Sequence, residues 1–298
     1  MILPFTRLRD FAASIPDGPK GAGYMLVSAT TISGMNGTVQ FLSGSIHVFE
    51  IAFFRQLFGV IFLSAVFLRD GLAPLITRRF GLHLLRAVLN VIALLSYFYG
   101  LSLEPLAKVV ALSLTAPLFA TVCAVIFLRE RMTARRWIGL FVGMAGALIV
   151  LRPGFQAVSL GAMLVLLSNT VWAVALVVIK SLARTESAPT ISLYAAILMT
   201  PITLAFALFV WEWPTANQLV WLVGIGVFGS IAQLCLSQSF RLVDATLVLP
   251  IDFTKIVWAS LIGYVVFNQV PEIWVWIGAT VTFAGVFYNT YQERGSRP

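Results

Sequence analysis

Long apolar runs, each about as long as a membrane-spanning helix, follow one another along almost the whole chain. About 20 apolar residues in a helix cross the ~30 Å hydrocarbon core of a bilayer. The alternation of apolar and polar residues at period two, which is typical of a β-barrel, is absent. The pattern predicts an all-α membrane protein with ten transmembrane helices, over residues 22–42, 48–68, 82–101, 106–127, 134–151, 158–179, 190–210, 217–239, 246–267 and 273–291.

The composition supports a membrane location. Hydrophobic residues make up 59% of the 298 residues and charged residues 11%, whereas soluble domains average about 25% charged residues. A soluble fold would therefore lack enough polar surface to cover itself. Residues 1–20 are short, charged and interrupted by proline, without the pattern of a signal peptide. We interpret them as a cytoplasmic N-terminal tail, and residues 293–298 as a cytoplasmic C-terminal tail.

The net charge of +8 reflects topology rather than nucleic-acid binding. Basic residues in short loops accumulate on the cytoplasmic side of a membrane protein. The loops that alternate spans assign to the opposite side hold only Arg152. Both termini are therefore expected in the cytoplasm, with no nucleic-acid partner. The basic residues on the cytoplasmic side are Arg7, Arg9, Lys20, Arg69, Arg78, Arg79, Arg129, Arg131, Arg135, Arg136, Lys180, Arg184, Arg241, Arg294 and Arg297.

The chain matches itself at an offset of 139 residues. Trp137-Ile138-Gly139 then aligns with Trp276-Ile277-Gly278, and Ala145-Gly146 aligns with Ala284-Gly285. Each half holds five predicted spans, and an odd number of crossings inserts the second half upside down. We therefore expect two inverted five-helix repeats, residues 21–153 and 154–292. Transporters built in this way bind their substrate near the bilayer midplane.

Three segments resemble the EamA-type carriers of the drug/metabolite transporter superfamily. They are EIAFFRQLFGVIFL (50–63), ALSLTAPLFATVCAVIFLRERMTARRWIGLFVGMAGALIVLRPG (111–154) and LPIDFTKIVWASLIGYVVF (249–267). The resemblance implies a bacterial cytoplasmic membrane, a central cavity formed by spans one to four and six to nine, and peripheral fifth and tenth spans. Members of the superfamily often have an acidic residue after the fourth and ninth spans; here Glu130 is present, whereas Phe267 is followed by Asn268 and Gln269.

Two charges interrupt the ninth predicted span. Asp252 and Lys255 are three residues apart, about 60° around a helix, and so are close enough to pair. One interpretation is an ion pair that neutralises itself and holds the helix in the bundle. The other, which we favour, is a site in a wet cavity, where Lys255 binds an anionic group and Asp252 a cationic group or a proton. Trp258, one turn further, offers a ring either to a ligand or to packing.

A further pair of charges lies in the second predicted span. Arg55 cannot lose its proton in a protein, so it needs a carboxylate, carbonyl groups or water. We predict an ion pair with Glu50, with Glu104 as the second choice. Such a pair would be structural or would form an outer gate, and an anion-binding role for Arg55 is the alternative.

Polar and aromatic side chains in other spans complete the candidate substrate site. Asn36, Asn169 and Gln233 lie deep in their spans, where they would bind substrate or join helices by hydrogen bonds. Tyr97 and Trp172 are candidates for an aromatic wall.

Sequence motifs for chemistry are missing. The chain has no HExxH, GxSxG or GxxxxGK[ST] motif, and Cys123 and Cys235 stand alone in their spans. No cofactor or metal is expected. The leading hypothesis is a secondary carrier that works by alternating access on an amino acid or a related zwitterionic or amine metabolite. The coupled species is a proton or an exchanged substrate. The alternatives are a retinal-binding photoprotein, since a buried lysine can form a Schiff base, and an intramembrane enzyme.

Overall fold

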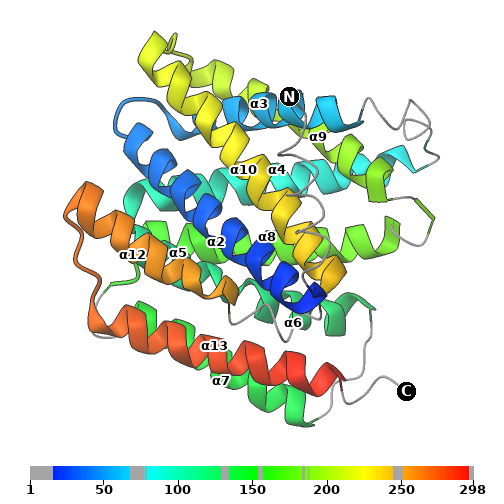
Figure 1. The fold of residues 1–298 in the computed structure, drawn as a ribbon, viewed down its shortest axis with the longest axis vertical. Coiled ribbons are helices and arrows are strands. Elements are labelled where there is room, and N and C mark those ends of the chain that lie inside the picture. The colour runs from blue at the N-terminus through cyan, green and yellow to red at the C-terminus, as the bar shows by residue number, and fades with distance from the viewer. Residues whose placement is uncertain are drawn as a thin grey trace, which may run out of the picture.

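The protein is helical throughout the part described by the computed structural model. That part comprises residues 16–67, 77, 79–128, 134–153, 157–182, 185–186, 188–243 and 251–294. Most of the predicted N-terminal tail, the acid Glu130 and the end of the C-terminal tail lie outside it. The elements, drawn in Figure 1, are α2 (Asp17–Leu42), α3 (Val48–Phe67), α4 (Phe80–Leu103), α5 (Leu106–Ser113), α6 (Ala116–Leu128), α7 (Ala134–Leu151), α8 (Leu160–Leu182), α9 (Ala188–Ala207), η2 (Leu208–Val210), α10 (Ala216–Leu242), α12 (Thr254–Phe267) and α13 (Ile273–Arg294).

A helix lies at each of the predicted spans. Within the described residues, four stretches are long and apolar enough to cross a membrane: Phe80–Leu103, Leu106–Phe127, Leu160–Leu182 and Ala216–Leu242. Shorter apolar helices cover Trp137–Leu151, Tyr194–Val210, Thr254–Phe267 and Ile273–Tyr288. The predicted all-helical, apolar character is confirmed.

The fourth predicted span is two helices rather than one. α5 ends at Ser113 and α6 begins at Ala116. Pro117 causes this break, because it has no N–H to donate to the carbonyl of Ser113 four residues earlier. The Thr115 hydroxyl donates to the Leu112 carbonyl at 2.7 Å, which favours a turn over a continuous helix.

The ninth predicted span is broken at the equivalent place. Phe253 is a turn residue between the helical residues Ile251-Asp252 and α12. The Thr254 hydroxyl donates to the Ile251 carbonyl at 2.7 Å. Thr115 and Thr254 are 139 residues apart, so the same hydroxyl-to-carbonyl bond marks the break in each half of the chain.

The helices α7 and α13 pack against each other through glycines, at one edge of the molecule (Figure 1). A Cβ added to Gly146 would lie 2.4 Å from the Thr282 nitrogen, and one added to Gly285 would lie 2.4 Å from the Gly143 nitrogen. Later residues of α7 therefore meet earlier residues of α13, so the two helices are antiparallel. Their backbones approach as closely as small residues allow in membrane helix pairs.

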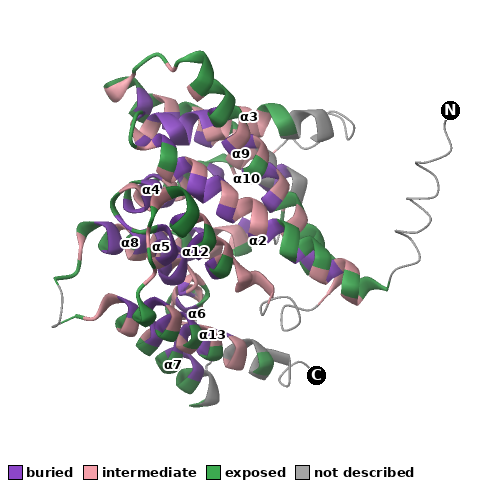
Figure 2. Cartoon of the chain, turned by 60° about the vertical axis from the view of Figure 1, so that its left-hand side comes forward, coloured by how far each residue is buried: buried purple, intermediate pink, exposed green. Residues whose placement is uncertain are grey.

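The outward side chains of this pair are apolar. Phe141 and Leu148 of α7 are 65% and 54% exposed, and Ile277 of α13 is 41% exposed. Figure 2 shows exposed residues along both helices, while the buried residues gather where helices pack on one another. Apolar side chains on the outside of a helical bundle suit contact with lipid.

Candidate functional site

Lys255 and Asp252 form an ion pair beside the break in the ninth span. The Lys255 ammonium lies 2.6 Å from Oδ1 and 2.7 Å from Oδ2 of Asp252. Asp252 precedes the turn at Phe253 and Lys255 lies in the first turn of α12, so the break sets the geometry of the pair. The two side chains remain 24% and 16% exposed. The pair is thus neutral overall and is not sealed within the packed core.

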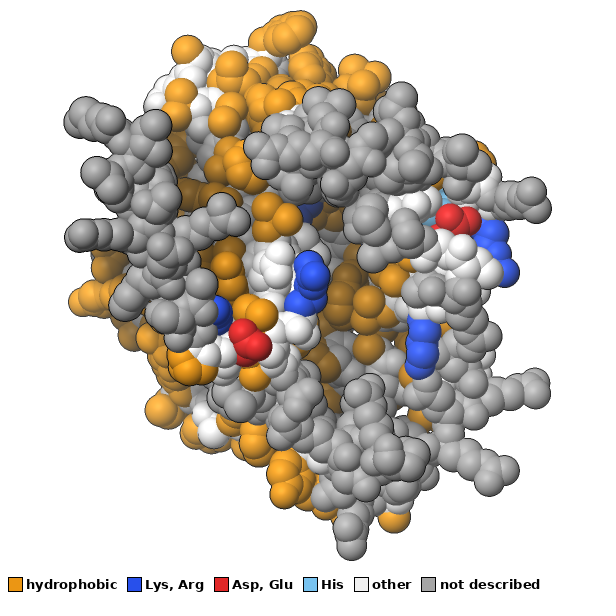
Figure 3. Space-filling view, turned by 45° about the vertical axis from the view of Figure 1, so that its right-hand side comes forward, with side chains coloured by type: hydrophobic (Ala, Val, Ile, Leu, Met, Phe, Trp, Pro, Cys, Tyr) orange, Lys and Arg blue, Asp and Glu red, His pale blue; other side chains and the backbone are white. Residues whose placement is uncertain are grey.

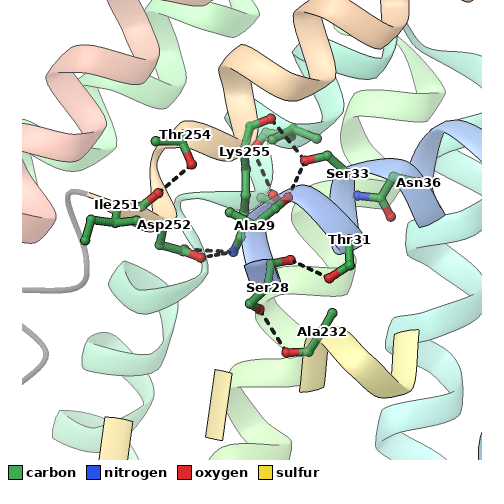
Figure 4. Close-up of polar contacts among 12 residues, drawn as sticks. Ser28, Ala29, Thr31, Ser33, Asn36, Ala232, Ile251, Asp252, Thr254 and Lys255 are labelled. Carbon is green, nitrogen blue, oxygen red and sulfur yellow. Dashed lines mark hydrogen bonds and ion pairs between the residues drawn. The ribbon is translucent and has the colours of Figure 1, made fainter. Parts of the chain in front are cut away.

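The helix α2 forms the wall opposite this pair (Figure 4). The Ser33 hydroxyl shares its proton between the Ala29 carbonyl of its own helix at 2.8 Å and the Lys255 carbonyl of α12 at 3.3 Å. The Ser28 hydroxyl donates to the Ala232 carbonyl of α10 at 2.9 Å. Ala29, between these serines, is fully buried. Small residues on α2 therefore bring three helices together around the charged pair.

Asn36 and Tyr97 form a second polar contact. The Asn36 amide donates to the Tyr97 hydroxyl at 3.0 Å and joins α2 to α4. The carbonyl oxygen of the Asn36 side chain is buried and has no hydrogen-bond partner. Buried polar atoms usually have one, so this oxygen is an acceptor that remains open to a ligand or to water.

Asn169 holds the break in the fourth span. Its amide donates to the Leu112 carbonyl at 2.9 Å and to the Thr115 hydroxyl at 3.0 Å. The first contact adds a donor from α8 to a carbonyl that also accepts from the backbone N–H and the hydroxyl of Thr115. Asn169 therefore connects α8 to the end of α5, which corresponds to the structural alternative considered for this residue.

The predicted ion pair between Arg55 and Glu50 is wrong. Arg55 instead donates to the side-chain carbonyl of Gln56 at 2.5 Å. Glu50 accepts a hydrogen bond from the backbone N–H of Glu212 at 3.4 Å. The reason lies in helix geometry: five residues correspond to about 140° around a helix at 3.6 residues per turn. The two side chains of α3 therefore point in different directions.

The guanidinium of Arg55 faces the middle of the bundle. A Cβ added to Gly229 of α10 would lie 3.5 Å from Nε of Arg55 and 3.1 Å from the sulfur of Met35 on α2. Nε is buried without a hydrogen-bond partner, and the structure gives Arg55 no carboxylate partner among the residues it describes. The Nε–H group of Arg55 is therefore free to donate to an acceptor.

The remaining candidates lie apart from these contacts. Trp172 on α8 is 41% exposed, Gln233 on α10 is exposed, and Trp258 on α12 is partly buried. Their roles stay predictions. Within the described residues there is no cluster of side chains suited to hold a metal ion.

Sequence reasoning missed Ser33 and Gln56. Ser33 lies three residues before Asn36, so both lie on one face of α2, and that spacing is a usable signal. Gln56 directly follows Arg55, and residues adjacent in sequence do not face each other across a helix surface. A search by helical periodicity could not find this partner.

One face of the molecule is hollowed. Figure 3 shows hydrophobic side chains lining this depression, with basic and acidic side chains beside it. A largely apolar hollow with a few charged groups is the usual character of a small-molecule site.

These features define a multi-pass helical membrane protein with a polar site among its helices. The profile of the EamA-like transporter family matches the chain twice, over residues 19–152 and 159–291. The chain belongs to the EamA-like transporter family. The resemblance seen in the sequence is confirmed, and the chain is a bacterial membrane protein of the drug/metabolite transporter superfamily.

Several curated relatives are transporters. The chain is 32% identical to a riboflavin transporter of Brucella anthropi over 83% of this chain and 89% of the relative. It is 30% identical to a riboflavin transporter of Vibrio cholerae, and 29% identical to an S-adenosylmethionine uptake transporter of Rickettsia bellii. Each of these two alignments covers 92% of this chain and 94% of the relative. One solved structure has the same fold, with a TM-score of 0.63 and 17% identity over 95% of this chain and 99% of that one.

Membership of a transporter family decides between the functional classes. The relatives are named as transporters and not as enzymes, so the alternative of an intramembrane enzyme is set aside. The retinal-binding alternative falls for the same reason. The protein is a transporter of a small molecule.

Proposed function

We propose that this protein is a secondary active carrier that moves a small zwitterionic metabolite across the bacterial cytoplasmic membrane by alternating access. The observation that carries the proposal is the partly exposed Lys255–Asp252 pair at the break in the ninth span. A buried ion pair stabilises a fold little compared with apolar side chains of similar volume. Packing alone is therefore a weak reason to place two charges there.

The positive and negative groups of the pair complement the carboxylate and the amino group of an amino acid. The carboxylate of a substrate would replace Asp252 beside the Lys255 ammonium. The amino group of the substrate would then pair with the Asp252 carboxylate. Both protein charges then keep a partner, whereas a substrate with a single charge leaves one of them unpaired. S-adenosylmethionine, which names one set of relatives, carries an amino-acid group of this kind.

The breaks provide the moving part. Interrupted helices at membrane depth are tolerated where they line a cavity, and transporters bind substrates at such helices. Exchange of the Lys255–Asp252 contact for substrate contacts would change the angle at Phe253. We propose that this change alters the packing of α12 against α2 and closes one side of the cavity as it opens the other.

We also propose that residues 21–153 and 154–292 are inverted repeats. Three observations support this relation: the antiparallel contact of α7 with α13, the breaks 139 residues apart, and the two family matches. The distribution of basic residues favours cytoplasmic termini. A reporter fused after Pro298 is expected to be active only in the cytoplasm, and periplasmic activity would contradict this orientation.

The proposed substrate class can be tested with purified protein. We expect amino acids or amino-acid conjugates, including S-adenosylmethionine, to raise the melting temperature and to exchange across proteoliposomes loaded with the same compound. Riboflavin serves as a probe without an amino-acid group. If riboflavin alone stabilises the protein and exchanges, the zwitterionic assignment is wrong although the protein is a carrier.

A further inference from the structure

Glu50 is a carboxyl group buried without a cation. It lies in the first turn of α3 and is 0% exposed. Its Oε2 accepts one hydrogen bond, from the Glu212 backbone at 3.4 Å. Its Oε1 is buried and has no hydrogen-bond partner. This carboxyl therefore lacks the pairing that a buried negative charge requires.

The charged and titratable groups around Glu50 do not neutralise it. Glu212, on the segment that follows η2, acts on it as a second negative charge. His47, on the loop before α3, uses its Nδ1 to accept from the Phe49 backbone at 3.2 Å, and its ring lies 6.2 Å from that of Tyr99 on α4. Arg55 bonds to Gln56. Protonation of Glu50 is the remaining way to remove the charge.

An open pocket of about 670 Å³ lies beside the segment whose backbone N–H donates to Glu50. It is lined by residues 43–47 and 208–212, at the end of the bundle expected to face the periplasm. Glu212 thus lines the pocket and also donates its backbone N–H to Glu50. The neighbouring Trp211 ring packs 5.9 Å from the Phe53 ring and 5.7 Å from the Phe54 ring, which holds this segment over α3.

We infer that Glu50 is the site that binds and releases the proton coupled to transport. In the structure, the segment of Trp211 and Glu212 covers Glu50, which is 0% exposed, and the carboxyl holds its proton. When this segment moves off α3, water reaches Glu50, the O–H bond breaks, and the proton passes to water in the pocket. The inference deepens the proposed function and rests on it, because it names the coupled ion of the same carrier.

The first test needs no substrate. Infrared difference spectra of the purified protein, recorded in proteoliposomes between acid and alkaline pH, should contain the band of a protonated carboxyl that disappears as pH rises. Glu50→Gln keeps the shape and an acceptor for the Glu212 backbone, so it should fold and lose the Glu50 component of this band, to which the other carboxyl groups still contribute. Glu212→Gln is the matched control and should retain it. Identical difference spectra for the wild type and Glu50→Gln overturn the inference.

The second test separates proton coupling from the movement of substrate itself. With a substrate found by the exchange assay, a pH gradient should drive accumulation in wild-type proteoliposomes. In Glu50→Gln, accumulation should fall to the level of protein-free liposomes, while exchange of substrate without a gradient continues. Loss of both activities in folded Glu50→Gln would place Glu50 in substrate movement itself and contradict the inference. Absence of exchange in the wild type would instead reject the proposed function, and the infrared test would still stand.

Discussion

Replacing Lys255 with methionine is expected to leave a folded protein that carries almost no substrate. Methionine has a similar length but cannot bind an anionic group, and it leaves Asp252 without its partner. Truncating one partner of a fully buried charge pair costs roughly 2–5 kcal/mol. Because this pair is partly exposed, we expect the lower end, about 2 kcal/mol, which is about a 30-fold fall in flux at 1.4 kcal/mol per tenfold. Glutamine at position 255 should keep part of the activity, because it can donate a hydrogen bond.

Lys108 provides the matched control. Its ammonium lies 2.8 Å from Oε2 of Glu104, and its side chain is 22% exposed, close to the 24% of Lys255. This second lysine–carboxylate pair lies at the start of α5 and away from the break. Flux into liposomes, normalised to folded protein, should stay near the wild-type level in Lys108→Met. If Lys255→Met also carries substrate at the wild-type rate, the Lys255–Asp252 pair is scaffolding and the site lies elsewhere.

Adding one methyl group at Gly285 is expected to destabilise the protein strongly. A glycine within a helix is normally improved by alanine, by roughly 0.5–1 kcal/mol. At Gly285 the new Cβ would lie 2.4 Å from the Gly143 nitrogen and 2.6 Å from the Gly139 carbonyl oxygen. Both contacts are with backbone, so α7 and α13 would have to separate, at a cost of roughly 1–3 kcal/mol or more.

The control for this substitution is Gly224 in α10, where an added Cβ meets nothing within 4 Å. Gly224→Ala should leave the melting temperature in detergent unchanged or raise it, whereas Gly285→Ala should lower it. The melting temperature is thus expected to fall in Gly285→Ala and not in Gly224→Ala. A Gly285→Ala protein as stable as the wild type would show that α7 and α13 do not pack as closely as described.

The ion pair at the ninth span could be predicted because the two residues are three positions apart. At that spacing one helical surface carries both side chains, whatever the rest of the fold does. The cost of an unpaired cation in the membrane predicts that Arg55 has a partner. It does not identify that partner. The five-residue spacing to Glu50 already argued against that choice.

The breaks were harder to predict. Hydropathy is continuous over Leu106–Phe127, so the apolar pattern indicates one helix. Pro117 and Thr115 carried the local signal, but proline is tolerated within many membrane helices. The role of Asn169 depends on the position of this break, because its amide donates to the Leu112 carbonyl and to the Thr115 hydroxyl at the turn between α5 and α6. The apolar periodicity of one segment does not predict contacts of this kind, which join side chains of one helix to the backbone of another.

The glycine contact between α7 and α13 has a consequence for biosynthesis. The contacting residues Gly143 and Thr282 are 139 residues apart in the chain. At a synthesis rate of about 5–20 residues per second, α13 is made roughly 7–28 seconds after α7. During that interval Gly143 can pack against Leu118 of α6, but the face of α7 that contacts α13 is uncovered. A chain that ends prematurely before α13 keeps this surface uncovered. The α7–α13 contact therefore forms only in a chain that has been synthesised as far as α13.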